Sequence, residues 1–312
     1  NDLAWLVFGI AIMIFVVVEA LIIWCVVRYR RRDRGEGEPA QVYGSGPIEL
    51  AWTVVPLVIV FVLFLVSARA IHELERTEPP ENSFPVTVVG HQWWWEFRYP
   101  ELGIVTANEL HLPASPREGA ERPVALTLRS ADVIHSFWVP RLAGKTDVVP
   151  NHPNLMWFVP TEPGVYWGQC AEYCGTQHAN MRIRVVVHEQ KEFDEWVAGQ
   201  QAAATRDERV KEGRELFLSL SCVSCHTVSG TGADGTFGPD LSHLMSRERI
   251  GAGVAMNTRS NLMKWVADPD SLKPGCNMPA MKLDDHELEL VVDYLLTLGP
   301  DRGTASSGEV SE

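Results

Sequence analysis

Two long apolar runs near the N-terminus constrain this 312-residue chain more than any other feature. The run 3–27 contains Glu19 as its only charged residue, and the run 50–68 contains none. A helix needs about 20 apolar residues to cross a hydrocarbon core of roughly 30 Å. Inside that core the backbone must satisfy its own hydrogen bonds, which a helix does. A secretory signal has a shorter apolar core and a cleavage site. We therefore expect residues 1–70 to form a transmembrane helical hairpin.

The connector between the two runs indicates the orientation of the hairpin. It has arginines at positions 28, 30, 31, 32 and 34, and basic loops remain on the cytoplasmic side of a membrane. We expect the loop at 28–49 to be cytoplasmic, with both termini and the rest of the chain on the periplasmic or outer face of a bacterial plasma membrane. The chain begins at Asn1 rather than Met, so removal of an N-terminal signal stays open.

The overall charge narrows the choice of partners. The formal net charge is -13, whereas nucleic-acid binding needs a basic surface that neutralises phosphates. Nucleic acid is therefore not an expected partner. An acidic excess favours solubility and suits a basic protein partner.

The remainder of the chain divides by composition into four segments. Short β-rich runs at 86–89, 125–128, 155–159 and 181–187, separated by Gly and Pro, predict a β-sandwich or barrel over 71–188. Residues 189–206 are charged and alanine-rich and favour a helical linker. Amphipathic patterns at 212–220 and 284–298 predict helices within 207–300, and the Gly/Ser/Glu-rich segment 301–312 favours disorder.

A cluster of soft metal ligands lies near the end of the β-rich segment. Cys170, Cys174, His178 and Met181 follow one another at spacings of four, four and three. Thiolate, imidazole and thioether groups select copper, zinc or iron–sulfur centres, and a methionine favours copper over zinc. His135, after a predicted strand and before a turn proline, is the candidate for a second imidazole. The alternative is a disulfide or a zinc clip at the two cysteines.

A second redox signature follows some fifty residues later. Cys222-Val-Ser-Cys225-His226 has the spacing of a covalent haem c site, in which two thioethers hold the porphyrin and the histidine binds the iron. A methionine is the expected sixth ligand, because it raises the reduction potential. Met278 and Met281 both lie at suitable positions. Cys276 lies two residues before Met278, close to a candidate haem ligand, and has no assigned role.

The copper motif and its surroundings resemble subunit II of haem-copper cytochrome c oxidases, from the hairpin to about residue 187. Cys-x-Glu-x-Cys-x3-His-x2-Met and the preceding Asp-Val-x-His-Ser carry this resemblance. It implies a cupredoxin-like Greek-key sandwich with a binuclear copper centre, CuA, bridged by two cysteines. The side-chain ligands that it implies are His135, Cys170, Cys174, His178 and Met181, with the Glu172 carbonyl as a backbone ligand.

The same resemblance implies three further roles. The Glu172 carboxylate would reach a magnesium ion shared with subunit I. Trp93, in Gln-Trp-Trp-Trp-Glu, matches the tryptophan at which electrons enter from a cytochrome c. Glu49 matches a glutamate at the entrance of a proton path in subunit I. The alternatives are a structural ring in the sandwich for Trp93 and a solvated helix-capping residue for Glu49.

Residues 207–299 resemble a class I cytochrome c, which implies an all-α domain. Gly213 and Tyr294 match positions where two helices of that family cross closely. Phe-Gly-Pro239 matches the loop whose proline carbonyl accepts a hydrogen bond from the axial histidine, here His226. Met278 precedes a proline as in the family's Met-Pro pattern, so it is preferred over Met281 as the sixth ligand.

Taken together, the chain resembles subunit II of a caa3-type cytochrome c oxidase. The resemblance implies that electrons pass from an external cytochrome through haem c to CuA, and then to subunit I, where oxygen is reduced to water with proton pumping. No residue of this chain is expected to be catalytic. The alternatives are a CuA subunit of a nitric oxide reductase and a membrane-tethered copper-binding or assembly protein. The docking of the haem domain and the identity of the donor stay open.

Overall fold

The structure is a computed structural model that describes residues 2–30, 41, 43–74, 78–115, 121–203 and 207–299. The chain forms two compact units, residues 1–77 and 78–312. The connector arginines at 31, 32 and 34 and the segment 301–312, for which disorder is predicted, lie outside the described residues.

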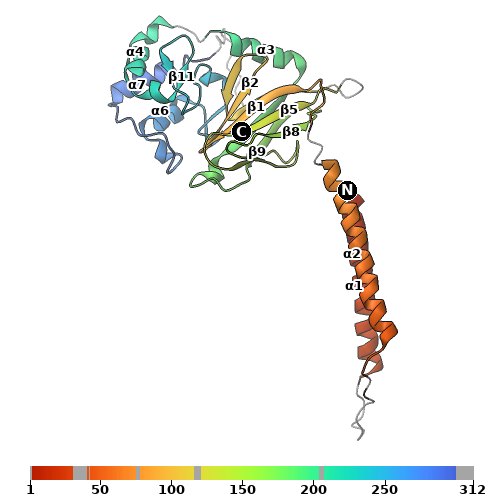
Figure 1. Ribbon diagram of the computed structural model, residues 1–312. Helices are drawn as coiled ribbons and strands as arrows, with labels where there is room; N and C mark the ends of the chain where they lie inside the picture. Colours follow the sequence, from red (N-terminus) through yellow and green to blue (C-terminus); the bar gives the residue numbers. More distant parts are fainter. Residues whose placement is uncertain are drawn as a thin grey trace. The chain divides into compact units, whose positions relative to one another are not determined.

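The first unit consists of two long helices that lie side by side (Figure 1), α1 (Asp2–Arg28) and α2 (Gly46–Leu74). Both are long and apolar enough to cross a membrane. Their large apolar side chains are exposed, as lipid-facing side chains are. The predicted hairpin is confirmed, although α2 extends beyond the expected span to Leu74.

The second unit begins with a β-sandwich of two five-stranded sheets (Figure 1). The first sheet has the order β3-β2-β1-β5-β8, with β1 (Phe84–His91), β2 (Trp94–Tyr99), β3 (Ile104–Ala107), β5 (Val124–Ser130) and β8 (Asn154–Phe158). The second has the order β4-β10-β9-β6-β7, with β4 (Glu109–Pro113), β6 (His135–Trp138), β7 (Thr146–Val148), β9 (Gly164–Cys170) and β10 (Arg182–His188). The pairs β1–β5 and β4–β10 are parallel, and the other pairs are antiparallel.

The core of the sandwich follows from the period-two patterns in its strands. In β10, Ile183, Val185 and Val187 are buried while the residues between them are more exposed. Trp95 and Phe137 meet between the sheets edge to face, with ring centroids 5.6 Å apart, an arrangement that the ring quadrupole favours. The sandwich is therefore a rigid, close-packed base for the loops at its ends.

The segment expected to be a linker is a helix that packs on the sandwich. α3 (Gln190–Gln201) buries Phe193, whose ring meets that of Phe84 at 5.6 Å, and Trp196 stacks on His111 at 4.5 Å. The predicted helix is present, and Phe193, Trp196 and Val197 join the sandwich core, while Gln200 donates to Ser246 of the C-terminal part at 2.8 Å.

We expect the His188→Gln variant to lose less stability in acid than the wild-type chain. The His188 ring stacks on His111 and lies beside Glu192 and Arg184. Burial, aided by the neighbouring His111, lowers the pKa of His188 from 6.5 to about 4. Between these values the unfolded chain binds a proton that the folded chain does not, so stability falls as pH decreases from about 6.5 to about 4.

Denaturant unfolding at pH 7 and pH 5 measures this difference. His152→Gln, at an exposed histidine of the same unit, is the matched control. A pH dependence as steep in His188→Gln as in the control would contradict the assignment.

The C-terminal part of the second unit, residues 207–299, is mainly helical. Its helices are η2 (Glu208–Val210), α4 (Lys211–Ser219), α5 (Cys222–Cys225), η3 (Leu244–Ser246), α6 (Arg259–Ala267), η4 (Pro269–Ser271) and α7 (Asp285–Leu295). Two short ladders, β11 (Thr227–Val228) with β12 (Ala233–Asp234) and β13 (Arg249–Ile250) with β14 (Ala255–Met256), join the loops. These ladders are small additions to the all-α expectation.

Local sequence explains the two helices that cross in this part. Asp284 and Glu287 form a reciprocal capping box that starts α7, which stabilises the first turn by satisfying otherwise unpaired amides. α4 packs against α7 at Gly213. A Cβ there would lie 2.0 Å from the Leu290 carbonyl oxygen, so the close crossing expected from the sequence requires glycine.

Candidate copper and haem sites

The soft ligands predicted from the sequence gather at one end of the sandwich. Cys170 ends β9, Cys174 lies in the following loop, and Met181 follows the short helix η1 (His178–Asn180) just before β10. His135 begins β6, which pairs with β9. The side chains of His135, Cys170, Cys174 and Met181 are at most 3% exposed.

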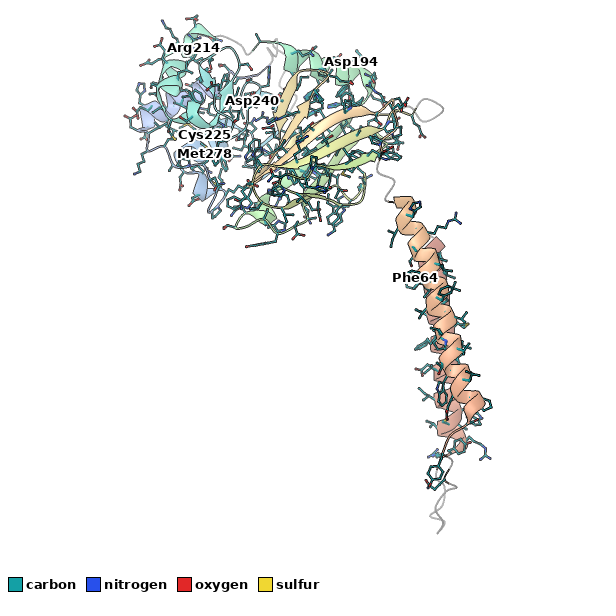
Figure 2. The ribbon with its side chains drawn as sticks, viewed as in Figure 1. Phe64, Asp194, Arg214, Cys225, Asp240 and Met278 are labelled. Carbon is teal, nitrogen blue, oxygen red and sulfur yellow. The ribbon has the colours of Figure 1, made fainter. Side chains whose placement is uncertain are left out.

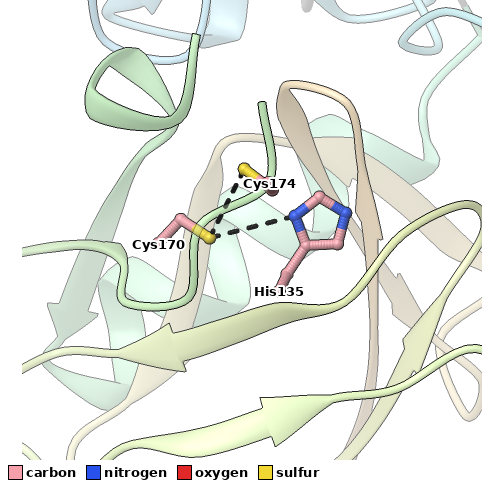
Figure 3. Close-up of side chains that lie close together, drawn as sticks. All are labelled: His135, Cys170 and Cys174. Carbon is pink, nitrogen blue, oxygen red and sulfur yellow. Dashed lines mark hydrogen bonds between the residues drawn. The ribbon is translucent and has the colours of Figure 1, made fainter. Parts of the chain in front are cut away.

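The side chains of His135, Cys170 and Cys174 point toward one another (Figure 3), with their ligand atoms within 4.8 Å. The sulfur atoms of Cys170 and Cys174 are 3.8 Å apart, and the Cys170 sulfur is 3.8 Å from Nδ1 of His135. The Cys174 sulfur is 3.5 Å from Nδ1 of His178 and 3.8 Å from the Met181 sulfur. The carbonyl oxygen of Glu172 lies 3.2 Å from the Cys170 sulfur.

This arrangement suits a copper centre and differs from a disulfide. A disulfide has its sulfur atoms about 2.05 Å apart, and both cysteines are free thiols here. The hydrogen bond from the Cys174 thiol lowers the pKa of Cys170, and the same contact raises the pKa of Cys174. Two thiolates, two imidazoles and a thioether form a donor set for copper.

Asp132 orients the imidazole of His135, a role that the sequence pattern did not assign. Its Oδ1 atom lies 2.8 Å from Nε2 of His135, which leaves Nδ1 facing Cys170. Its Oδ2 atom accepts from the backbone of Gln92 at 2.6 Å. Although burial raises the pKa of Asp132, these hydrogen bonds lower it overall. A carboxylate behind a ligating histidine fixes the tautomer and strengthens the ligand. The spacing Asp-x-x-His was the available signal.

The histidine of the haem motif is held in the same manner. Nδ1 of His226 lies 2.7 Å from the carbonyl oxygen of Pro239, so the hydrogen bond expected from the Phe-Gly-Pro loop is present. It leaves Nε2 as the nitrogen available to iron. Burial lowers the pKa of His226, which favours the neutral, ligating form. A Cβ at Gly238 would lie 2.6 Å from the His226 ring, so glycine is needed where the loop passes this ring.

An apolar cavity of about 340 Å³ adjoins this histidine. Its lining includes Cys222, Cys225, His226, Met278, Met281 and Trp93. Cys225 and Met278 lie near each other in Figure 2. The two thiols, the imidazole and a methionine around one apolar space fit a covalently attached haem.

The two candidate axial methionines have different neighbours. The sulfur of Met281 is 3.9 Å from the Ser221 hydroxyl, beside Cys222. The carbonyl oxygen of Met278 lies 3.7 Å from the Cys276 thiol. Cys276 is half-buried on the cavity wall, and burial raises its pKa. Both methionines line the cavity, and the choice of Met278 stays a prediction.

Trp93 contacts both the haem cavity and the loop 171–181 between β9 and β10, here called the copper loop. Its indole Nε1 donates to the carbonyl of Cys174 at 3.0 Å, while its ring lines the cavity. A Cβ at Gly175 would lie 3.0 Å from this ring, and Gly175 has a positive φ of 113°. The copper loop thus passes directly against the indole, which is only 9% exposed.

The side chains of Glu172 and Glu49 make other contacts. The Glu172 side chain is exposed and accepts from the Tyr173 backbone. Glu49 lies in the first turn of α2, where Oε1 accepts from the backbone of Ser45 at 3.2 Å. Glu49 therefore has the capping contact of the alternative interpretation, and its proton role stays a prediction.

Comparisons with known proteins cover most of the chain. Residues 1–70 match "Cytochrome C oxidase subunit II, transmembrane domain", residues 118–188 match "Cytochrome C oxidase subunit II, periplasmic domain", and residues 210–299 match "Cytochrome c". The cytochrome c oxidase subunit 2 of Alkalihalophilus pseudofirmus is 36% identical over 293 residues, covering 92% of this chain and 83% of that protein. The same subunit of Bacillus subtilis is 33% identical, covering 87% and 80%.

A solved structure is also similar to part of the chain. The periplasmic domain of subunit II of cytochrome oxidase from Bradyrhizobium japonicum aligns with 30% identity and a TM-score of 0.35, covering 38% of this chain and 94% of that one.

Two membrane-length helices, a cupredoxin-like sandwich with buried soft donors, and a cytochrome c domain define a membrane protein that carries electrons. The chain belongs to the cytochrome c oxidase subunit II family and is a subunit of that oxidoreductase complex. This membership implies copper in the sandwich and haem in the cytochrome c domain.

Proposed function

We propose that this chain is the electron-input subunit of a caa3-type cytochrome c oxidase. An external cytochrome reduces the haem c held by Cys222, Cys225, His226 and Met278. The electron then passes to the CuA centre and on to the haem-copper site of subunit I, where oxygen is reduced to water with proton pumping. The donors of CuA are His135, Cys170, Glu172, Cys174, His178 and Met181.

The position of Trp93 is the observation that carries this proposal. Its ring lines the haem cavity, and its Nε1 atom donates to the carbonyl of the copper ligand Cys174. One side chain thus contacts both redox sites within a single compact unit. Trp93 serves as the junction between the chain's own haem and copper centres.

The protein's contribution is to hold the donors rigidly around each centre. When bound, a dicopper pair spreads one electron over two metals and so lowers the reorganisation that accompanies each transfer. Asp132 fixes the ring of His135, and Pro239 fixes that of His226. Burial of the thiols excludes water from the sulfur atoms. Pre-organised ligands of this kind need little movement when charge changes.

Three further assignments belong to the same proposal. The exposed carboxylate of Glu172 contributes to a magnesium site at the interface with subunit I, and Glu49 lies at the entrance of a proton path. The loop 28–49 is cytoplasmic, and both termini and the redox domains are on the outer face. The domain limits are 1–70, 71–188, 189–206 and 207–300, followed by a tail.

We expect Met181→Leu to leave haem c reducible but to slow electron delivery to subunit I. Leucine has a similar volume, so the fully buried site keeps its packing, but the thioether is lost. Stopped-flow reduction of the purified complex, with oxygen consumption as the second readout, measures both steps. A fall of roughly 10–100-fold, the range found when a metal site loses a supporting group, is expected.

Met156→Leu is the matched control, because Met156 is a buried methionine of β8 in the same sandwich. Unchanged turnover in Met181→Leu would refute the CuA assignment. Absorption bands of a mixed-valence dicopper centre together with a c-type haem separate this function from that of a copper-carrying assembly protein. Copurification with an oxygen-reducing subunit separates it from a nitric oxide reductase.

A further inference from the structure

A buried lysine lies where the cytochrome c domain meets the copper loop. Lys273 follows η4 and is 3% exposed. Its Nζ donates to the backbone carbonyls of Trp93 at 2.7 Å, Asn180 at 2.9 Å and Gly251 at 3.0 Å. These carbonyls come from the β1–β2 turn, the copper loop and the β13–β14 turn.

Burial lowers the pKa of Lys273 to about 7, and the three acceptors favour the charged form of this amine. An ammonium group has three N–H donors and no acceptor, whereas a neutral amine has two donors and a lone pair. A neutral Lys273 would leave one carbonyl facing a lone pair. The site is therefore built for an ammonium ion whose lost hydration is replaced by charge-assisted hydrogen bonds.

The loop that follows Lys273 is attached to the copper loop at further points. Asn277 donates from its side chain to the carbonyl of Gln92 at 2.9 Å, and Gln177 donates to the carbonyl of Pro274. Met278 directly follows Asn277 in the chain. The segment that presents the proposed haem ligand is therefore held against both the β1–β2 turn and the copper loop.

A second buried charge, of opposite sign and from the opposite domain, holds another part of the same interface. Glu109 on β4 is 1% exposed, and its Oε1 accepts from the backbone amides of Glu248 at 3.0 Å and Arg249 at 2.9 Å. Its Oε2 pairs with Arg184 at 3.1 Å. Arg182 adds a backbone hydrogen bond to Ala252 at 3.3 Å. The two domains are thus joined by buried polar contacts at separate points.

We propose that Lys273, with Glu109 as its counterpart, is a positioning residue that locks the cytochrome c domain onto the copper loop and so sets the rate of haem-to-copper electron transfer. This inference rests on the proposed function. In the transfer one electron leaves the ferrous haem, which becomes ferric, and reduces the dicopper centre; no bond forms or breaks. The haem domain is then a fixed relay and not a swinging carrier.

The test compares Lys273→Met with the wild type in the complete oxidase complex. The first readout is hydrogen exchange at the amides of Arg182, Glu248 and Arg249, whose acceptors belong to the opposite domain. The second is haem c reoxidation after photochemical injection of one electron. We expect about tenfold faster exchange and about tenfold slower reoxidation, because three charge-assisted hydrogen bonds together exceed the ~1.4 kcal/mol that corresponds to a factor of ten.

Lys264→Met is the matched control, since Lys264 is an exposed lysine on α6 of the same domain. It should leave both readouts at wild-type values. Glu109→Gln tests the attachment between the two domains even if Lys273→Met does not fold. It should raise the rate of hydrogen exchange at the amides of Glu248 and Arg249 in particular.

Each outcome decides the proposal. Wild-type exchange and wild-type reoxidation in Lys273→Met would overturn it. Loss of the dicopper or haem absorption bands would also overturn it, because that result assigns Lys273 to folding of a site instead of positioning. Failure of the proposed function has a different signature: the wild-type complex itself would not pass the injected electron from haem c to copper.

Discussion

Cys174→Ser is expected to abolish copper binding in the sandwich and to reduce oxygen consumption by the complex by more than about 100-fold. The Cys174 sulfur is the central donor of the site, since it lies within 3.8 Å of the donor atoms of Cys170, His178 and Met181. A serine hydroxyl is neither soft nor ionised at neutral pH, so it would not replace a thiolate donor to copper. Loss of a supporting residue already costs 10–100-fold, and loss of a thiolate, a stronger donor than the Met181 thioether, should cost more.

Metal analysis and the copper absorption bands measure the first effect, and an oxygen electrode measures the second. Haem c should still be attached and reducible, because its site is formed by other residues. Cys25→Ser is the control, because it makes the same change at a free thiol on α1. Full copper content in Cys174→Ser would show that this thiol is not a ligand.

Gly213→Ala is expected to destabilise the cytochrome c domain by about 2 kcal/mol or more. The added Cβ would lie 2.0 Å from the Leu290 carbonyl oxygen and 3.3 Å from the Tyr294 Cβ. Backbone atoms cannot rotate away, so α4 and α7 must separate and expose the core around Phe217. The usual gain from replacing glycine in a helix, about 1 kcal/mol, is too small to compensate for this overlap.

For a domain of this size, such a loss lowers the melting temperature by roughly 10 °C. Thermal melting of the full chain, followed at the haem absorption band, measures this shift. Gly232→Ala is the control in the same domain, because no atom lies within 4 Å of its added Cβ. If both variants melted together, the close crossing of α4 and α7 would not be a determinant of stability.

Features that depend on neighbours in the sequence were predicted well. The hairpin was predicted because an uncharged run of this length has no other way to satisfy its backbone in lipid. The helix starting after Asp284 was predicted because its capping residues lie within one turn. The packing of α3 on the sandwich was not predicted, because it depends on residues from distant strands. Trp196 stacks on His111, a residue from a strand far earlier in the chain.

The proposed copper ligands are predicted in part from neighbours in the sequence and in part only from the fold. Cys170, Cys174, His178 and Met181 lie in one loop, so their spacing alone predicts a shared centre. His135 is 35 residues from Cys170 and reaches it because β6 pairs with β9. The orienting role of Asp132 likewise appears only when the ring of His135 is placed.

By itself, the sequence determined the membrane hairpin, the chemical identity of both redox sites and the order in which they follow one another. Ligand chemistry and short spacings are properties of a local segment, so they can be read without the fold. Only the tertiary structure decided how the sites are joined. Lys273 binds the carbonyl of Trp93 across 180 residues of chain, and no local pattern marks such a pair. Contacts of this kind arise when packing brings distant loops together, and burial then requires that their polar groups find partners.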